Sequence, residues 1–90
     1  MTYYLAKQLD TKGWRYSLSK WEDGATYPEQ TYVVNLGSYC DCPSPKRPCK
    51  HDGILREMLQ ASQDRGIRIF ELYWEDGIVH DTNDLRGALT

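Results

Sequence analysis

The sequence predicts one α+β domain, in which a small antiparallel sheet packs on a single helix and a further β-hairpin follows at the C-terminal end. Residues 14–21, WRYSLSKW, alternate apolar and polar side chains with a period of two, which is typical of a strand with one buried face. Residues 54–61 repeat apolar side chains at helical spacing. Asp76-Gly77 is a typical two-residue hairpin turn between two strand-like segments.

The N-terminal third of the chain predicts a hairpin. Residues 2–9 are rich in Tyr and Leu and predict its first strand. The segment Asp10–Gly13 predicts a tight turn, because Gly13 can adopt a positive φ. On the second strand, the face that we expect to be buried carries Trp14, Tyr16 and Leu18.

A third strand, a helix and a second hairpin follow. The third strand is predicted at 31–37, after a polar loop at 22–30, with Tyr32, Val34 and Leu36 on one side. The helix buries Ile54, Leu55 and Met58 and ends at Gly66. Residues 67–74 predict a strand that turns at Asp76-Gly77 into residues 78–80. We therefore expect a single domain over residues 1–90, with a C-terminal hairpin at about 67–81.

Composition and charge exclude several classes of protein. The chain has 90 residues, 12% aromatic residues and a formal net charge of −2, which fits a globular domain and argues against disorder. That charge lacks the basic excess of proteins that bind mainly through phosphates. We expect no signal peptide and no membrane span, and hence a cytoplasmic protein, or a nuclear one in a eukaryote, with reduced thiols.

All three cysteines and one of the two histidines lie within residues 40–51, CDCPSPKRPCKH. A disulfide between Cys40 and Cys42 would close a strained ring and leave the third cysteine unpaired. A Cys–His nucleophile needs only one thiol and an orienting group. Three cysteines and one histidine match a ligand set that structural Zn²⁺ commonly uses. The cluster therefore favours structural zinc over the other two interpretations.

The spacing also suits a shared metal. Residues two apart in an extended chain point to the same side, so Cys40 and Cys42 can reach one ion. Residues two apart in a helix diverge by about 200°. We therefore expect Cys49 just before the helix and His51 in its first turn. With four protein ligands, no position remains for a catalytic water, and the metal is expected to hold structure.

The segment YVVNLGSYCDCPSPKRPCKHDGILREML resembles the SWIM-type zinc finger, whose pattern is Cys-x-Cys, a variable spacer and Cys-x-His. Pro43 after Cys42 and the run Pro48-Cys49-Lys50-His51 match the usual steps of that family. The resemblance implies one structural Zn²⁺ held by Cys40, Cys42, Cys49 and His51, within a ββα zinc-finger core at about 31–62. Domains of this family are usually appendages of larger enzymes and are proposed to bind DNA or other proteins, whereas we expect no catalytic partner domain in this chain.

Two kinds of partner stay open, and a protein partner is slightly favoured. Trp and Tyr are common interface anchors, and Trp21, Tyr27 and Tyr39 lie near predicted loops. We expect Trp14, Tyr16, Tyr32, Phe70 and Trp74 to be structural. DNA binding is the alternative, through a basic patch of Lys46, Arg47, Lys50 and Arg56 with Tyr39 for stacking. We expect no enzyme and no small-molecule substrate, because no phosphate loop, catalytic triad or second metal cluster is evident.

Overall fold

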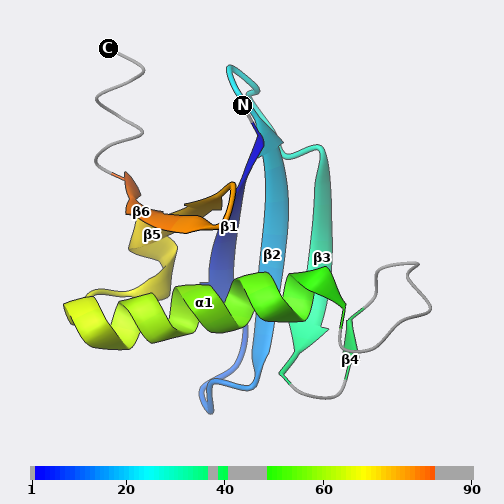
Figure 1. Ribbon diagram of the computed structural model, residues 1–90. Coiled ribbons are helices and arrows are strands. Elements are labelled where there is room, and N and C mark those ends of the chain that lie inside the picture. The colour runs from blue at the N-terminus through cyan, green and yellow to red at the C-terminus, as the bar shows by residue number, and fades with distance from the viewer. Residues whose placement is uncertain (1, 37–38, 41–48, 83–90) are drawn as a thin grey trace.

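Six strands, one α-helix and one 3₁₀ turn make up the described part of the chain, which in this computed structural model is residues 2–36, 39–40 and 49–82, with Tyr39 and Cys40 described by their backbone alone. In chain order they are β1 (Thr2–Gln8), β2 (Arg15–Glu22), β3 (Gln30–Asn35), β4 (Tyr39–Cys40), α1 (Lys50–Arg65), η1 (Ile69–Glu71), β5 (Leu72–Glu75) and β6 (Ile78–Asp81). The strands form one antiparallel sheet in the order β4-β3-β2-β1-β5-β6, and α1 lies across one face of it (Figure 1). The predicted α+β class is confirmed.

β1 and β2 form the predicted hairpin around a turn that Asp10 organises. Its Oδ1 atom accepts hydrogen bonds from the backbone N–H groups of Gly13 (3.1 Å), Trp14 (3.2 Å) and Arg15 (3.2 Å). Gly13 adopts a φ of +81°, a conformation that glycine reaches without steric cost. Partial desolvation raises the pKa of Asp10, but the backbone donors outweigh it, so the pKa lies below its ordinary value of 3.8.

The alternation on β2 holds for Tyr16 and Leu18 but not for Trp14. Tyr16 and Leu18 are buried in the core, as predicted. Trp14 is 62% exposed, so its assignment to the core is wrong. The reason is the position of the turn: β2 begins at Arg15, and Trp14 lies before the alternation starts.

The core lies between α1 and the sheet face that it covers. The largest fully buried side chains come from both layers: Leu18, Val34, Leu55, Met58 and Leu72. Burying each such side chain stabilises the fold by about 1.5–3 kcal/mol. The predicted apolar helix face, Ile54, Leu55 and Met58, is confirmed as buried.

Both ends of α1 are defined by the residues that the sequence predicted. The helix begins directly after Cys49, which has extended backbone angles (φ −85°, ψ 170°). It ends at Gly66, whose φ of +66° is left-handed and whose N–H donates to the carbonyl of Ser62. In the last turn, the guanidinium of Arg65 donates to the carbonyl of Val79 at 2.9 Å and joins the helix to β6. Neither helix among the described residues is long and apolar enough to cross a lipid bilayer.

The predicted strand over 67–74 is wrong in its first half, where Ile69–Glu71 form the η1 turn. The N–H of Glu71 donates to the carbonyl of Arg68 at 2.9 Å, and the N–H of Arg68 donates to the Glu71 carboxylate at 3.1 Å. These backbone groups are satisfied locally, so they need no neighbouring strand. Because the turn buries Ile69 and leaves Phe70 55% exposed, the assignment of Phe70 to the core is also wrong.

β5 and β6 form the predicted C-terminal hairpin, but it is not a separate addition to the sheet. Asp76 and Gly77 both have positive φ (+50° and +84°), as the favoured two-residue hairpin turn requires. β5 also pairs with β1, with Tyr4 opposite Trp74 and Leu5 opposite Tyr73. The hairpin therefore continues the same sheet beyond β1, on the side opposite β3.

Candidate metal centre

Cys49 and His51 come together at the start of α1, where the sequence placed them. Cys49 is the residue before the helix, and His51 lies in the first turn. Both are buried, with 6% and 4% of their surface exposed. The Sγ atom of Cys49 is 3.9 Å from Nδ1 of His51.

This separation can be compared with what one zinc ion would require. Zn–S bonds of about 2.3 Å and Zn–N bonds of about 2.0–2.1 Å at a tetrahedral angle place the two ligand atoms about 3.6 Å apart. The observed 3.9 Å differs from that value by only a few tenths of an ångström. The two side chains therefore fit a shared Zn²⁺ with little rearrangement.

Two tyrosines hold the imidazole of His51 against the sheet. The ring of Tyr32 on β3 stacks on it, with centroids 4.1 Å apart and planes at 27°. Tyr4 on β1 presents its edge at 6.1 Å, and burial raises the pKa of the Tyr4 hydroxyl, with a smaller effect from Glu29 and Glu22. This contact between two rings and a histidine fixes the plane of the imidazole, as a metal ligand requires.

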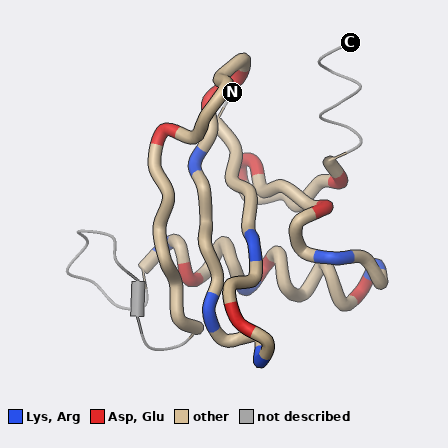
Figure 2. The backbone as a smooth tube through the Cα atoms, turned by 180° about the vertical axis from the view of Figure 1, so that it is seen from behind, with Lys and Arg blue, Asp and Glu red and all other residues tan. Residues whose placement is uncertain are grey.

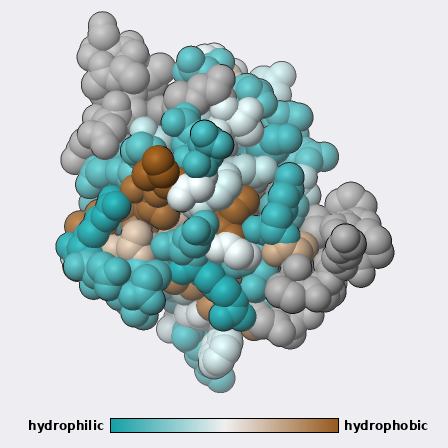
Figure 3. All heavy atoms as spheres, viewed as in Figure 1, coloured by the Kyte–Doolittle hydropathy of each residue, from teal (hydrophilic) through white to brown (hydrophobic). Residues whose placement is uncertain are grey.

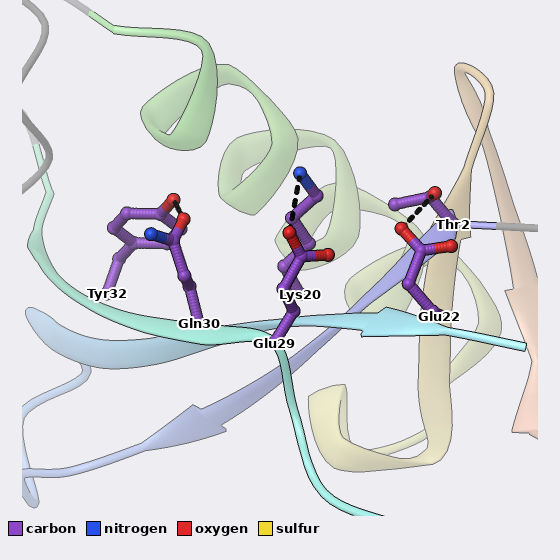
Figure 4. Close-up of polar contacts among 6 residues, drawn as sticks. All are labelled: Thr2, Lys20, Glu22, Glu29, Gln30 and Tyr32. Atoms are coloured by element: carbon purple, nitrogen blue, oxygen red, sulfur yellow. Dashed lines mark hydrogen bonds and ion pairs between the residues drawn. The ribbon is translucent and has the colours of Figure 1, made fainter. Parts of the chain in front are cut away.

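The side chain of Tyr32 is itself held in place. Its hydroxyl donates to Oε1 of Gln30, two residues earlier on β3. Figure 4 shows Tyr32, Gln30 and the Lys20–Glu29 ion pair (3.9 Å) extending from the sheet toward the side where α1 lies. The sequence placed Tyr32 on the core side of its strand, but gave no signal that its partner is His51, 19 positions further along the chain.

The other two expected ligands can be placed only in part. Cys40 belongs to β4, at a register position opposite Val34, which is fully buried beneath α1. β4 is an edge strand of the sheet and lies near the start of α1 (Figure 1). Cys42 lies outside the described residues, and of Cys40 only the backbone is described. Among the described side chains, no three His, Cys, Asp or Glu residues are grouped so that they could hold a metal ion.

Of the basic patch predicted beside the zinc ligands, the structure describes the side chains of Arg56 and Lys50. Arg56 is paired with Asp52, with Nε 2.7 Å from Oδ2, an i,i+4 contact that the spacing could have revealed. Lys50 is exposed and lies beside Glu57, at a shallow hollow that also includes Trp74. Figure 3 shows that hydrophobic side chains reach this face only in small areas between hydrophilic ones. Lys46 and Arg47 lie outside the described residues, as does the side chain of Tyr39.

The aromatic residues expected near loops differ in their exposure to solvent. Tyr27 is 75% exposed, as predicted. Trp21 is only partly exposed, because it lies on β2 and its ring stacks on that of Tyr3 at 6.4 Å. Tyr16, Tyr32 and Trp74 are buried in the core or packed against it, so the structural role predicted for them is confirmed.

Comparison with known proteins places the chain in no family. No protein-family model matches it, and neither do curated proteins or solved structures. The likeness to the SWIM-type finger therefore rests on the sequence motif.

Proposed function

We propose that this chain is a zinc-binding module of the SWIM type, in which one structural Zn²⁺ is held by Cys40, Cys42, Cys49 and His51. The observation that carries the proposal is the 3.9 Å separation between the buried Sγ of Cys49 and Nδ1 of His51. The ββα core at about 31–62 would then consist of β3, β4 and the first three turns of α1. The module acts by binding, as a protein-interaction or accessory domain.

The proposed metal would link the start of the helix to β4, because Cys49 and His51 are buried beside each other there and Cys40 lies on β4. A structural Zn²⁺ contributes apparent binding energies of about 10–16 kcal/mol in small fingers near pH 7. A domain of 90 residues has a small core, so the metal would supply a large part of its stability.

Metal analysis tests this proposal directly. Protein purified without added zinc should contain one zinc per chain by elemental analysis, and a strong chelator should remove both the metal and the helical circular dichroism signal. Cys49→Ser should lower the zinc content and the melting temperature. Protein that holds no metal and keeps its spectrum in chelator would contradict the proposal.

The binding role is supported by aromatic and aliphatic side chains that the fold leaves at the surface. Tyr27 and Trp14 lie in or beside loops, Phe70 lies in η1 and Ile78 lies at the start of β6, and all four are exposed. Exposed large side chains of this kind are enriched where proteins bind one another. Pull-down from native lysate, with and without nuclease, separates the two kinds of partner: proteins retained after nuclease support this role, and loss of every partner favours DNA.

A further inference from the structure

The sheet has a second face, turned away from α1, that carries its own aromatic row, in which Tyr3 and Tyr73 are already buried, with 7% and 6% of their surface exposed. We call it the open face and define it by Tyr3, Leu5 and Lys7 of β1, Arg15, Ser17, Ser19 and Trp21 of β2, and Tyr73 and Glu75 of β5, which alternate with the core residues. Its rings are in contact across four strands: Trp21 with Tyr3 at 6.4 Å, Tyr3 with Tyr73 at 5.7 Å, and Tyr73 with His80 at 4.9 Å.

A hollow lies in the middle of the open face. It has a volume of about 480 Å³ and lies between Leu5, Lys7, Trp21 and Phe70. Phe70, from η1, projects beside it with 55% of its surface exposed. A projecting ring and a hollow on one face are complementary features, which two copies of the same surface can each offer to the other.

Charge on the open face is divided between its two ends. Lys7, Arg15 and Arg68 lie toward one end, and none of them forms an ion pair with another described residue. Asp23 and Glu75 lie toward the other end, near Tyr3; the pKa of Tyr3 is raised by desolvation first and by the charge of Asp23 second. Figure 2, which looks onto this face, shows acidic positions around the N-terminal end of β1 and basic positions on the opposite halves of β1 and β2.

Two further carboxylates, at the basic end, already accept hydrogen bonds from backbone N–H groups. Asp10 accepts the N–H groups of its turn, and Glu71 accepts the N–H of Arg68. At the acidic end, by contrast, neither Asp23 nor Glu75 forms an ion pair with another described residue.

We propose that the open face binds a second copy of this chain, with the two sheets face to face and their β1 strands antiparallel. A two-fold axis level with Leu5 sets the Lys7 end of β1 in each copy over the Tyr3 end of the other, about 13 Å along the strand. Lys7 then meets Glu75 of the other copy, and Arg15 meets Asp23. The apolar side chains of Leu5, Trp21 and Phe70 are covered at the centre.

The distribution of charge favours a second copy of the chain as the partner, with the β1 strands antiparallel. A parallel arrangement would set like charges opposite each other, which is unfavourable. A nucleic-acid strand would be attracted to the basic end and repelled by Asp23 and Glu75 at the other, so it matches only half of the face. A second copy matches both halves of the face.

Sedimentation velocity of the full, metal-loaded chain tests the proposal. The mass should rise with concentration from 10.5 kDa toward twice that value, and association should weaken as salt is raised. Phe70→Ser should also weaken it. A chain that stays monomeric up to about 1 mM, where even a weak interaction of about −4 kcal/mol would show, overturns the proposal and leaves the face to a different partner.

A charge exchange provides the decisive test, and it does not depend on zinc or on a fold defect. Arg15→Asp and Asp23→Arg should each raise the dimer dissociation constant at least about tenfold, because every dimer contains the contact twice. An equimolar mixture of these two variants should restore dimerisation, since each altered residue then meets its opposite charge. Lys20→Glu is the control, because it reverses a charge on the helix-covered face of the same sheet and should leave association unchanged. A mixture no better than the separate variants would contradict the proposal.

Discussion

Nε1 of Trp74 donates a 2.6 Å hydrogen bond to Oε2 of Glu57, which joins the C-terminal hairpin to the middle of α1. The two residues lie 17 positions apart, one on β5 and one on the exposed side of the helix. Because the acceptor is a carboxylate, the bond is of the stronger, charge-assisted kind. Substitution of these two residues therefore tests how strongly the hairpin is attached to the helix.

Trp74→Phe should lower the free energy of unfolding by about 1–2 kcal/mol, because it removes the donor and part of the buried ring. Glu57→Gln should cost less, since its amide oxygen can still accept the bond. Urea unfolding of both variants and of the double variant gives the coupling energy. A coupling near zero would show that the bond contributes nothing to the attachment.

The two histidines provide a matched comparison for the proposed metal site. His51 stacks on Tyr32, and His80 stacks on Tyr73 in a similar way. His51→Ala should abolish stoichiometric zinc binding and unfold the domain or greatly lower its melting temperature. His80→Ala should keep the zinc and lose only a stacking contact, worth about 1 kcal/mol. Equal zinc content in the two variants would contradict the assignment of His51.

Alkaline pH should destabilise the protein through its buried tyrosines. Burial is the main cause that raises the pKa of Tyr3, Tyr4 and Tyr16 above the ordinary 10.0. A raised pKa means that the folded state holds its proton more tightly than the unfolded state. The stabilisation is therefore complete below pH 10 and is lost as pH rises from there through the folded-state pKa.

Thermal unfolding between pH 8 and 11.5 measures this effect. Each such tyrosine adds at most about 1.4 kcal/mol per pH unit to the decline, so Tyr16→Phe should give a shallower slope above pH 10 than the unaltered chain. At pH 8 the two proteins should differ only by the loss of one hydroxyl. An unchanged slope would show that Tyr16 ionises equally easily in both states.

Two glycines, Gly53 inside α1 and Gly66 directly after its last residue, should respond in opposite directions to the same substitution. Gly53 lies inside the helix with open space around its Cα, so Gly53→Ala should raise stability by about 0.5–1 kcal/mol. Gly66 has equal space but a φ of +66°, which an alanine adopts only with strain. Gly66→Ala should therefore lower stability by about 1 kcal/mol. Chemical denaturation of both variants decides, and a destabilising Gly53→Ala would indicate that the start of the helix is more crowded than the structure shows.

The features that the sequence predicts well are those that short stretches of chain determine. Gly66 ends the helix and Asp76-Gly77 turns the hairpin because each needs a backbone conformation that few other residues adopt. Tyr16 and Leu18 follow from a period of two on one strand. The sequence also predicts Cys49 before the helix and His51 in its first turn, from the argument that residues two apart inside a helix could not share a metal, and the structure has both residues there.

The features that it misses depend on contacts between distant segments. Nothing local shows that β5 pairs with β1, about 70 positions earlier, and so makes one sheet of two hairpins. The apolar character of Trp14 and Phe70 predicts burial, whereas turn geometry places both at the surface. The stack of Tyr32 on His51 likewise joins β3 to α1, and the sequence pattern of neither element predicts this contact. The complete ligand set stays a prediction, because Cys42 lies outside the described residues.

The contact between Arg65 and Val79 has a consequence for how the protein behaves in a crowded solution. β6 is an outermost strand, and the free peptide groups of such strands are the usual template on which misfolded or foreign chains add and grow into fibres. By occupying the carbonyl of Val79, the guanidinium removes one of the acceptors that an incoming strand would use. The helix thereby leaves one fewer free acceptor at this edge of the sheet for strand addition.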